Sequence, residues 1–266
     1  MDLGLRGRVC VVTGASGGIG LEVTRQLCDE GAKVMMVSRD PEQLAAMSEV
    51  VRAEGGEVEV VVKDVTSDAA GQHILAAARQ SFGQVDVLVN NAGAAEWKPL
   101  EDASEEDFRF QFELSVIAPL NLMRAAIPEM AGRGWGRVVN VSSTAGKRPS
   151  AMMPDYSVGK AAMLSLSRQF AERHASEGVM VNAICPGPTA SDLWMAEGGL
   201  LDQSRLAAGL ESREAALKAA GEKRPVGRLA TPEEIASAIV FLCSERASYV
   251  SGAAWGVDGG TVPVII

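Results

Sequence analysis

Short β-branched runs alternate with longer amphipathic stretches along almost the whole chain. This alternation constrains the fold most, because strands joined by helices pair in parallel and each crossover must cover one face of the sheet. The runs are continuously apolar, as expected of strands that are buried on both faces. The pattern therefore predicts a doubly wound α/β fold with about seven parallel strands. The predicted strands are residues 8–13, 33–38, 57–63, 86–90, 136–142, 179–185 and 253–257.

The length and the absence of linkers indicate a single domain. The 266 residues contain no Pro/Ser/Gly-rich tract and no block of charge that would divide them, so we expect one domain spanning residues 1–266. Residues 189–224 break the strand–helix rhythm and follow the carboxyl end of a strand, where such sheets bind ligands. We expect this segment to fold as one or two helices that form a lid.

Charge and composition argue against several classes of protein. A net charge of −9 disfavours nucleic acid or an anionic membrane as the main partner, because both require a cationic surface. The apolar runs are too short to span a bilayer and no leader pattern precedes the first strand, so a cytoplasmic location is expected. Four cysteines without Cys-x-x-Cys spacing, and only two histidines, predict reduced thiols and no metal site.

A glycine-rich turn joins the first predicted strand to a helical pattern. Its sequence is TGASGGIG at residues 13–20. Glycine here permits a tight turn, close approach of the backbone to a pyrophosphate and close packing of helix on strand, with the helix N-terminus facing the anion. An ordinary loop can also be rich in glycine. The strand before the turn, the helix after it and a second strand ending near Ser38 favour a dinucleotide site.

The residues after the second strand bear on which dinucleotide is bound. Enzymes that use NAD typically place a carboxylate there for the ribose hydroxyls, whereas this chain has Ser38, Arg39 and Asp40. Arg39 can form a charge-assisted contact with a 2′-phosphate, to which Ser38 adds a hydroxyl. NADP(H) is therefore the preferred prediction and NAD(H) the second. Alternatively, Arg39 is a solvated loop cation and Asp40 caps the helix that starts at Pro41.

A tyrosine and a lysine four residues apart form the candidate catalytic pair. Tyr156 and Lys160 lie on one face of a predicted helix, and Ser143 ends the preceding strand. A phenol with an ordinary pKa of ~10 is a poor base at neutral pH, and an adjacent ammonium favours the phenolate. Tyr156 can then exchange a proton with an alcohol or carbonyl oxygen. Such a pair alone is more often a surface feature, but here it follows a strand of the cofactor-binding sheet.

Taken together, these motifs resemble those of the short-chain dehydrogenase/reductase family, from about residue 5 to residue 260. The resemblance implies a Rossmann-type fold and an oxidoreductase that moves a hydride between a nicotinamide cofactor and its substrate. The nearest-looking members are the 3-oxoacyl-[acyl-carrier-protein] reductases. The matching motifs are the turn at 13–20, Asp64-Val65, NNAG at 90–93, Ser143 with Tyr156-Ser157-Val158-Gly159-Lys160, Pro186-Gly187 and DGG at 258–260.

The resemblance also implies roles for individual residues. Ser143 would hold the substrate oxygen, Tyr156 would be the general acid/base, and Lys160 would bind the nicotinamide ribose while biasing Tyr156. Asp64 and Val65 would line the adenine, Asn91 the adenosine side and residues 186–189 the nicotinamide. The full set expected to contact the cofactor is Gly14, Ser16, Gly17, Ile19, Gly20, Ser38, Arg39, Asp64, Val65, Asn91, Ala92, Gly93, Tyr156, Lys160, Pro186, Gly187 and Thr189.

One position departs from the family pattern. The family commonly has an asparagine in the helix before the serine strand, where it supports a water that leads to the lysine. Aligning back from Ala126-Ile127-Pro128 puts Ser115 at this position. A hydroxyl can still hold a water, so Ser115 is retained as a candidate member of the catalytic group.

The predicted function is NADP(H)-dependent interconversion of a ketone and a secondary alcohol by a homo-tetramer. One alternative is 3-oxoacyl-[acyl-carrier-protein] reductase, against which stand the acidic chain and the presence of Gly134 and Glu172 where docking cations would be sought. The other is a non-catalytic, cofactor-binding regulatory protein. Several apolar side chains near the site suggest an apolar small-molecule substrate, unless they serve packing or subunit contact. They are Met152, Met153, Leu193, Trp194, Met195, Leu200 and Leu201.

Overall fold

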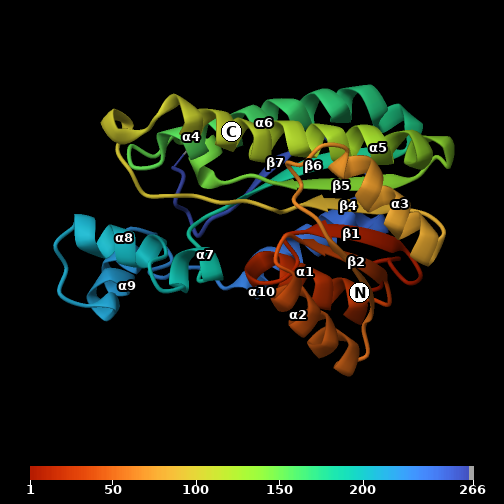
Figure 1. The fold of residues 1–266 in the computed structure, drawn as a ribbon. Helices are drawn as coiled ribbons and strands as arrows, with labels where there is room; N and C mark the ends of the chain where they lie inside the picture. Colours follow the sequence, from red (N-terminus) through yellow and green to blue (C-terminus); the bar gives the residue numbers. More distant parts are fainter. Residues whose placement is uncertain (264–266) are drawn as a thin grey trace.

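Seven parallel strands form one sheet in the computed structural model, which describes residues 1–263 (Figure 1). The order β3-β2-β1-β4-β5-β6-β7 reverses direction between β1 and β4. This reversal is the place where open α/β sheets bind ligands, beyond the carboxyl ends of the strands. The strands are β1 Val9–Thr13, β2 Lys33–Ser38, β3 Glu57–Val62, β4 Val87–Asn90, β5 Gly136–Val141, β6 Val179–Pro186 and β7 Ala254–Val257.

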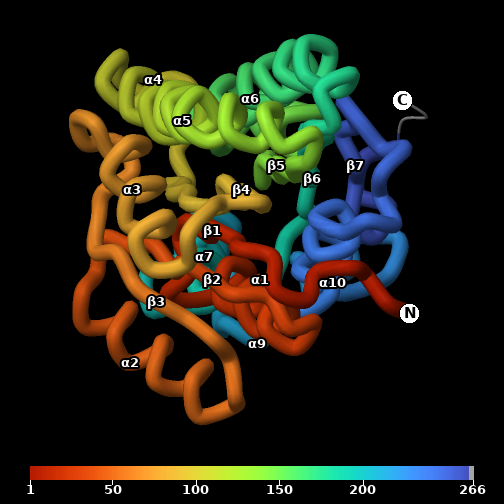
Figure 2. The backbone as a smooth tube through the Cα atoms, turned by 90° about the vertical axis from the view of Figure 1, so that its right-hand side faces the viewer, coloured from red at the N-terminus to blue at the C-terminus, as the bar shows by residue number. Residues whose placement is uncertain are grey.

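Helices cover both faces of the sheet, as Figures 1 and 2 show. One core contains apolar residues of α1, α2 and α10, and the other contains residues of α3, α5 and α6. The α-helices are α1 Gly18–Asp29, α2 Pro41–Ala53, α3 Ala70–Phe82, α4 Glu105–Phe112, α5 Ala118–Gly132, α6 Pro154–His174, α7 Asp192–Met195, α8 Leu200–Ala207, α9 Arg213–Glu222 and α10 Pro232–Cys243. A π-helical stretch, Glu113–Ile117, joins α4 to α5, and a 3-10 turn, Thr144–Gly146, follows β5.

The predicted strands agree with the observed strands to within a residue or two at each end. The expected burial on both faces holds for β1, β4 and β5, whose residues are all buried, including the polar Arg137 and Asn140 of β5. It fails for β3, which lies at the edge of the sheet and exposes Glu57 and Glu59 together with Val60 and Val62. Charged side chains on an edge strand discourage pairing with another chain.

The segment predicted as a lid folds as three short helices, α7, α8 and α9, rather than one or two. They extend beyond the carboxyl ends of the strands, on the left in Figure 1. Gly198 and Gly209 have positive φ angles in the two connections and so permit the chain to reverse twice. None of the helices within residues 1–263 is both long and apolar enough to cross a membrane.

Candidate active site

A cavity of about 1100 Å³ opens at the carboxyl ends of the strands. Its walls come from the β1–α1 turn, the ends of β2 to β6, the loop from Ser143 to Tyr156, and α7 to α9. All the predicted site residues line this cavity except Gly20 and Ser115. The topology therefore brings together groups that are up to 175 positions apart, since Gly14 and Thr189 share the same space.

The glycine turn is held open by the side chains of Thr13 and Asn91. Thr13 Oγ1 accepts hydrogen bonds from the backbone N–H groups of Asn91 and Ala92, at 2.9 and 3.0 Å. The Asn91 amide in turn donates to the carbonyl oxygens of Thr13 and Gly14, at 2.9 and 3.2 Å. Asn91 was expected on the adenosine side of the site. Its side-chain amide ties β4 to the turn, and because the residue also lines the cavity, the expected adenosine contact stays a prediction.

Two glycines in the turn are required for steric reasons. Gly14 has a φ of +65°, a conformation that L side chains rarely adopt. A Cβ at Gly20 would overlap the carbonyl oxygen of Gly14, so glycine lets α1 pack directly on the turn. Gly20 thus shapes the cradle without lining it.

The end of β2 forms a polar corner beside the turn. Ser16 Oγ and Ser38 Oγ are 2.9 Å apart, and Ser16 Oγ also donates to Gln43 Oε1 at 3.2 Å. Asp40 Oδ1 accepts from the N–H groups of Glu42 and Gln43 and so caps α2. Because this carboxylate is used by the helix, the corner presents hydroxyls and a cation to a ligand.

Arg39 is exposed at the mouth of this corner and lines the cavity. It forms no ion pair within the described residues. Two hydrogen bonds from Thr66 hold the pKa of Asp64 below its usual range, and the positive charge of Arg39 contributes in the same direction. A glycine cradle at a helix N-terminus, two hydroxyls and a free guanidinium together fit a phosphorylated dinucleotide.

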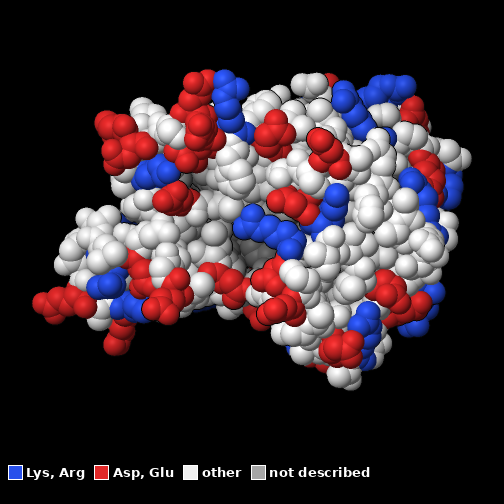
Figure 3. Space-filling model, in the orientation of Figure 1, with Lys and Arg blue, Asp and Glu red and all other residues white. Residues whose placement is uncertain are grey.

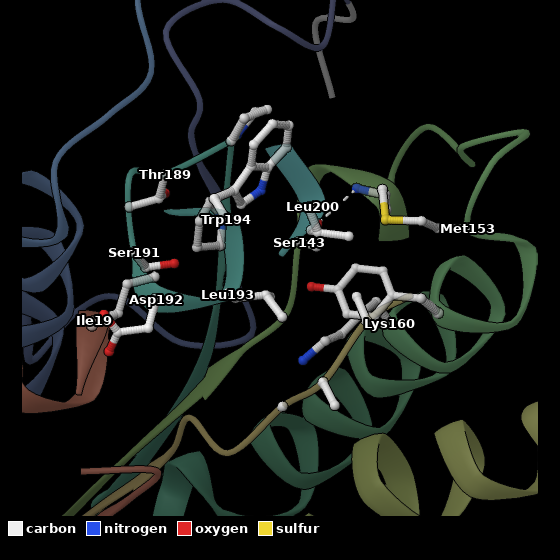
Figure 4. Close-up of a pocket in the computed structure, with 18 of the residues that line it drawn as sticks. Ile19, Ser143, Met153, Lys160, Thr189, Ser191, Asp192, Leu193, Trp194 and Leu200 are labelled. Carbon is white, nitrogen blue, oxygen red and sulfur yellow. Dashed lines mark hydrogen bonds between the residues drawn. The ribbon is translucent and has the colours of Figure 1, made fainter. Parts of the chain in front are cut away.

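Hydrogen bonds fix the start of α6 against β5 at the opposite side of the cavity. Ser142 Oγ donates to the Lys160 carbonyl oxygen at 2.9 Å, and Lys160 Nζ donates to the Val141 carbonyl oxygen at 2.8 Å. Ser143 and Tyr156 line the same cavity, and the Ser143 side chain lowers the pKa of the Tyr156 phenol. Figure 4 shows Ser143 and Lys160 directed into the cavity, facing Ser191 and Asp192, which lie beside Ile19.

Burial governs the ionisation of the catalytic pair. Burial lowers the pKa of Lys160 from 10.5 to about 8. Burial also raises the pKa of Tyr156, and the opposing effect of the Ser143 side chain offsets only part of this rise. In this arrangement burial outweighs any lowering of the Tyr156 pKa by the ammonium, and the stabilisation of the phenolate by Lys160 stays a prediction. Lys160 Nζ lies 5.5 Å from the centre of the Tyr156 ring and donates to a carbonyl oxygen instead. The phenol is protonated at neutral pH and is ready to act as an acid.

Ser115 lies behind the catalytic helix, in the π-helical stretch. It is 1% exposed, and its Oγ has no hydrogen-bond partner within residues 1–263. The Cβ of Ser115 is close to Gly159, where the absence of a side chain lets α6 approach α4. Ser115 therefore sits next to the Tyr156–Lys160 turn without reaching the cavity.

The α7–α9 segment closes one side of the cavity with mixed side chains. Leu200 and Leu201 are buried, and of the apolar candidates Met195 and Leu201 do not line the cavity. Gln203 Oε1 accepts from the Trp97 backbone N–H at 2.7 Å, which joins α8 to the loop after β4. Trp194, Leu193 and Leu200 project into the cavity (Figure 4).

The sequence analysis missed several lining residues. Ser191 and Asp192 follow the predicted turn at residues 186–189 and touch the glycine turn, since a Cβ at Gly17 or Gly18 would meet them. Their position just after Thr189 was the available signal. Three cations, Arg148, Lys223 and Arg224, also line the cavity. Nothing in their sequence spacing indicated that they would come together.

Comparisons with known proteins agree with this geometry. A family model described as enoyl-(acyl carrier protein) reductase matches residues 14–262. The cis-4-hydroxycyclohexanecarboxylate dehydrogenase of Sinomonas cyclohexanicum is 37% identical over 258 residues, 97% of each chain. The 3-oxoacyl-[acyl-carrier-protein] reductase of Thermotoga maritima is 33% identical over 260 residues, 97% of this chain and 99% of that protein.

Solved structures give the same result. The crystal structure of L-sorbose reductase from Gluconobacter frateurii, complexed with NADPH and L-sorbose, matches with a TM-score of 0.92 at 33% identity over the full length of both chains. The Rossmann-type α/β fold is thereby confirmed, and the non-catalytic alternative loses its support. From the motifs, the cavity and these relatives together, we conclude that the chain is an NAD(P)-dependent oxidoreductase and belongs to the short-chain dehydrogenase/reductase family.

Proposed function

We propose that the whole chain acts as one catalytic domain that interconverts a ketone and a secondary alcohol, with NADP(H) as the preferred cofactor. The observation that carries this proposal is the grouping of Ser143, Tyr156 and Lys160 in the cavity that also contains the glycine turn. The L-sorbose reductase, a structural relative, is described as a complex with NADPH and a small sugar ketone.

Each side chain has a defined task in this proposal. The Ser143 hydroxyl donates a hydrogen bond to the carbonyl oxygen and so orients it toward Tyr156. Tyr156, whose pKa is raised, gives its proton to that oxygen as negative charge develops there. Lys160, with a pKa of about 8, is charged at neutral pH and stabilises the resulting phenolate. The bound cofactor supplies or accepts the hydride.

The preference for NADP(H) rests on the corner at the end of β2. Arg39 is exposed there and has no ion-pair partner among the described residues, while Asp40 is engaged in capping α2. A 2′-phosphate would gain a charge-assisted hydrogen bond from Arg39 and a hydroxyl contact from Ser38. Ser38 and Arg39 follow β2 where a carboxylate typically holds the ribose hydroxyls of NAD, and the nearby Asp40 uses its Oδ1 to cap α2.

The test is steady-state oxidation of NADPH with a panel of ketones, followed by absorbance, for the wild type and for Tyr156→Phe. The phenylalanine variant keeps the ring and removes the proton donor, so turnover should fall by ~10²–10⁴ while cofactor affinity is retained. Lys218→Gln, at a side chain of α9 that is 78% exposed and does not line the cavity, serves as the control. Undiminished turnover in Tyr156→Phe would refute the assignment.

A second candidate is the reduction of 3-oxoacyl groups on an acyl carrier protein. The family model and the Thermotoga maritima relative support it. The net charge of −9 disfavours docking of an acidic carrier, although Figure 3 shows basic side chains interspersed with the acidic ones on the face it presents. Comparing kcat/KM for one 3-oxoacyl group on the carrier and on a short thioester separates the two, because a true carrier substrate would be strongly preferred.

We also propose that the protein is a cytoplasmic homo-tetramer. The reduced cysteines suit that compartment, and the exposed apolar side chains on two faces suit subunit contacts. The first face is on and around α4 and α6, and the second is near β7. A subunit contact is also expected at the C-terminus, but residues 264–266 lie outside the described residues. The exposed apolar residues are Leu100, Phe110, Phe112 and Val158 on the first face, and Tyr249 and Trp255 on the second. Sedimentation of a stable monomer would contradict the assembly.

A further inference from the structure

One end of the cavity is strongly cationic. Arg148 lies in the loop just after Ser143, and its backbone N–H donates to the Thr144 carbonyl oxygen at 2.8 Å. Lys223 and Arg224 come from the end of α9 and line the same cavity. The acidic residues among the described lining residues are Asp40, Asp64 and Asp192, on the side of the β1–α1 turn and the end of β2. In a chain of net charge −9, this end is a local exception.

Arg148, Lys223 and Arg224 differ from the basic residues of α8 and α9, which form ion pairs. Arg205 and Arg213 both pair with Asp202, and Lys218 pairs with Glu222. Arg148, Lys223 and Arg224 form no ion pair with any of residues 1–263. Two arginines that approach each other without a carboxylate between them repel, unless an anion is bound there.

The Arg224 guanidinium has one N–H group without a hydrogen-bond acceptor among the described residues. Its Nη1 donates to the Ala220 carbonyl oxygen, which fixes the orientation of the group. Its Nε is fully buried and has no hydrogen-bond partner within the described residues. Burial lowers the pKa of Arg224, and the neighbouring charge of Arg148 lowers it further. A buried donor without a partner is costly, so a ligand oxygen that this N–H reaches after a small shift of the side chain would be favoured.

We propose that Arg224 and Arg148 bind a carboxylate on the substrate, so that the enzyme acts on oxo and hydroxy acids. The inference rests on the proposed function, since it places the carboxylate at one end of the cavity and the reacting carbonyl at Ser143 and Tyr156. A guanidinium edge matches the two oxygens of a carboxylate, and Arg148 adds a second charge. Met152, Met153 and Leu200 line the cavity as well and would contact an apolar body between the two ends.

The catalytic test compares 4-oxocyclohexanecarboxylate with its methyl ester, using NADPH and the intact protein. The wild type should favour the acid by tenfold or more in kcat/KM. Arg224→Gln should lower kcat/KM for the acid by about ten- to a hundredfold, mainly through KM, and leave the ester unchanged. Arg148→Gln should act in the same direction with a smaller effect, because its side chain is exposed. Lys218→Gln removes one positive charge from α9 outside the cavity and should leave kcat/KM unchanged for both the acid and the ester.

A binding measurement separates this inference from the oxidoreductase chemistry. Titration calorimetry of unreactive cyclohexanecarboxylate into the protein with NADP⁺ should show binding that Arg224→Gln weakens by about tenfold or more and Lys218→Gln does not. If this binding is observed but no ketone is reduced, the carboxylate site is supported and the proposed ketone reduction is refuted. If the wild type reduces ketones yet treats acid and ester alike, or if Arg224→Gln impairs both equally, the carboxylate site is overturned.

Discussion

Replacing Lys160 by methionine should stabilise the folded chain at neutral pH while removing a group that the proposed chemistry needs. Lys160 is 3% exposed, and burial lowers its pKa from 10.5 to about 8. That lowering corresponds to about 3 kcal/mol by which the folded state disfavours the ammonium form. Methionine keeps an unbranched apolar stem. The variant also loses the 2.8 Å hydrogen bond from Lys160 Nζ to the Val141 carbonyl oxygen, which costs about 1 kcal/mol. The expected net increase in the free energy of unfolding is therefore about 2 kcal/mol.

The pH dependence identifies the cause of this gain. Below pH 8 the lysine is charged in both the folded and the unfolded state, so the wild type carries the full burial penalty. Between pH 8 and 10.5 the unfolded chain binds more protons than the folded one, and the stability of the wild type therefore rises with pH. The advantage of Lys160→Met should be largest below pH 8 and should fade toward pH 10.5.

Urea unfolding at several pH values and one fixed protein concentration measures the effect, because subunit association also shifts apparent stability. Lys218→Met, at a side chain that is 78% exposed, is the matched control and should leave the free energy of unfolding unchanged. A variant of Lys160 that is less stable than the wild type at pH 7, or an advantage that stays constant up to pH 10.5, would refute the reasoning.

Three further outcomes are expected. Arg39→Ala should weaken NADPH binding about ten- to a hundredfold in a fluorescence titration and leave NADH nearly unaffected, whereas equal weakening of both would exclude a 2′-phosphate contact. Ser115→Ala should lower turnover only several-fold and raise thermal stability slightly, since its buried hydroxyl has no partner among residues 1–263, and a thousandfold loss would instead make Ser115 a full catalytic member. Gly20→Ala should cost about 1–3 kcal/mol in urea unfolding and weaken cofactor binding, because its Cβ would overlap the Gly14 carbonyl oxygen, and an unchanged variant would show that the turn relaxes freely.

The sheet was predictable because a strand that is buried on both faces is encoded by a run of mostly apolar residues. Strands β1, β4 and β5 are mostly apolar and were placed to within a residue or two. The edge position of β3, in contrast, depends on strand order, which local patterns do not encode. The glycine turn and the Tyr156–Lys160 spacing could be found because each is a local motif whose neighbours in sequence are also neighbours in space.

The remainder of the site depends on tertiary placement. Arg148 and Arg224 are separated in sequence by all of α6 and β6 and by the α7–α9 segment, and only the packing of that segment brings both into the lining of one cavity. The direction of the Tyr156 pKa likewise depends on how deeply α6 is buried, which the sequence does not state. Ser115 was correctly located near α6, but its separation from the cavity follows from the close approach of α6 to α4 at Gly159.

The α7–α9 segment contacts both halves of the cavity at once. Asp192, at its start, lies against Gly17 of the glycine turn, and Arg224, just after its end, lines the cavity together with Arg148 and Ser143. Occupancy of either half therefore changes the environment of a shared element, which makes the two binding free energies interdependent. By linkage, whatever factor the cofactor adds to the affinity for the substrate, the substrate adds to the affinity for the cofactor. Such reciprocity would make the ternary complex, rather than either binary complex, the state that this segment stabilises most.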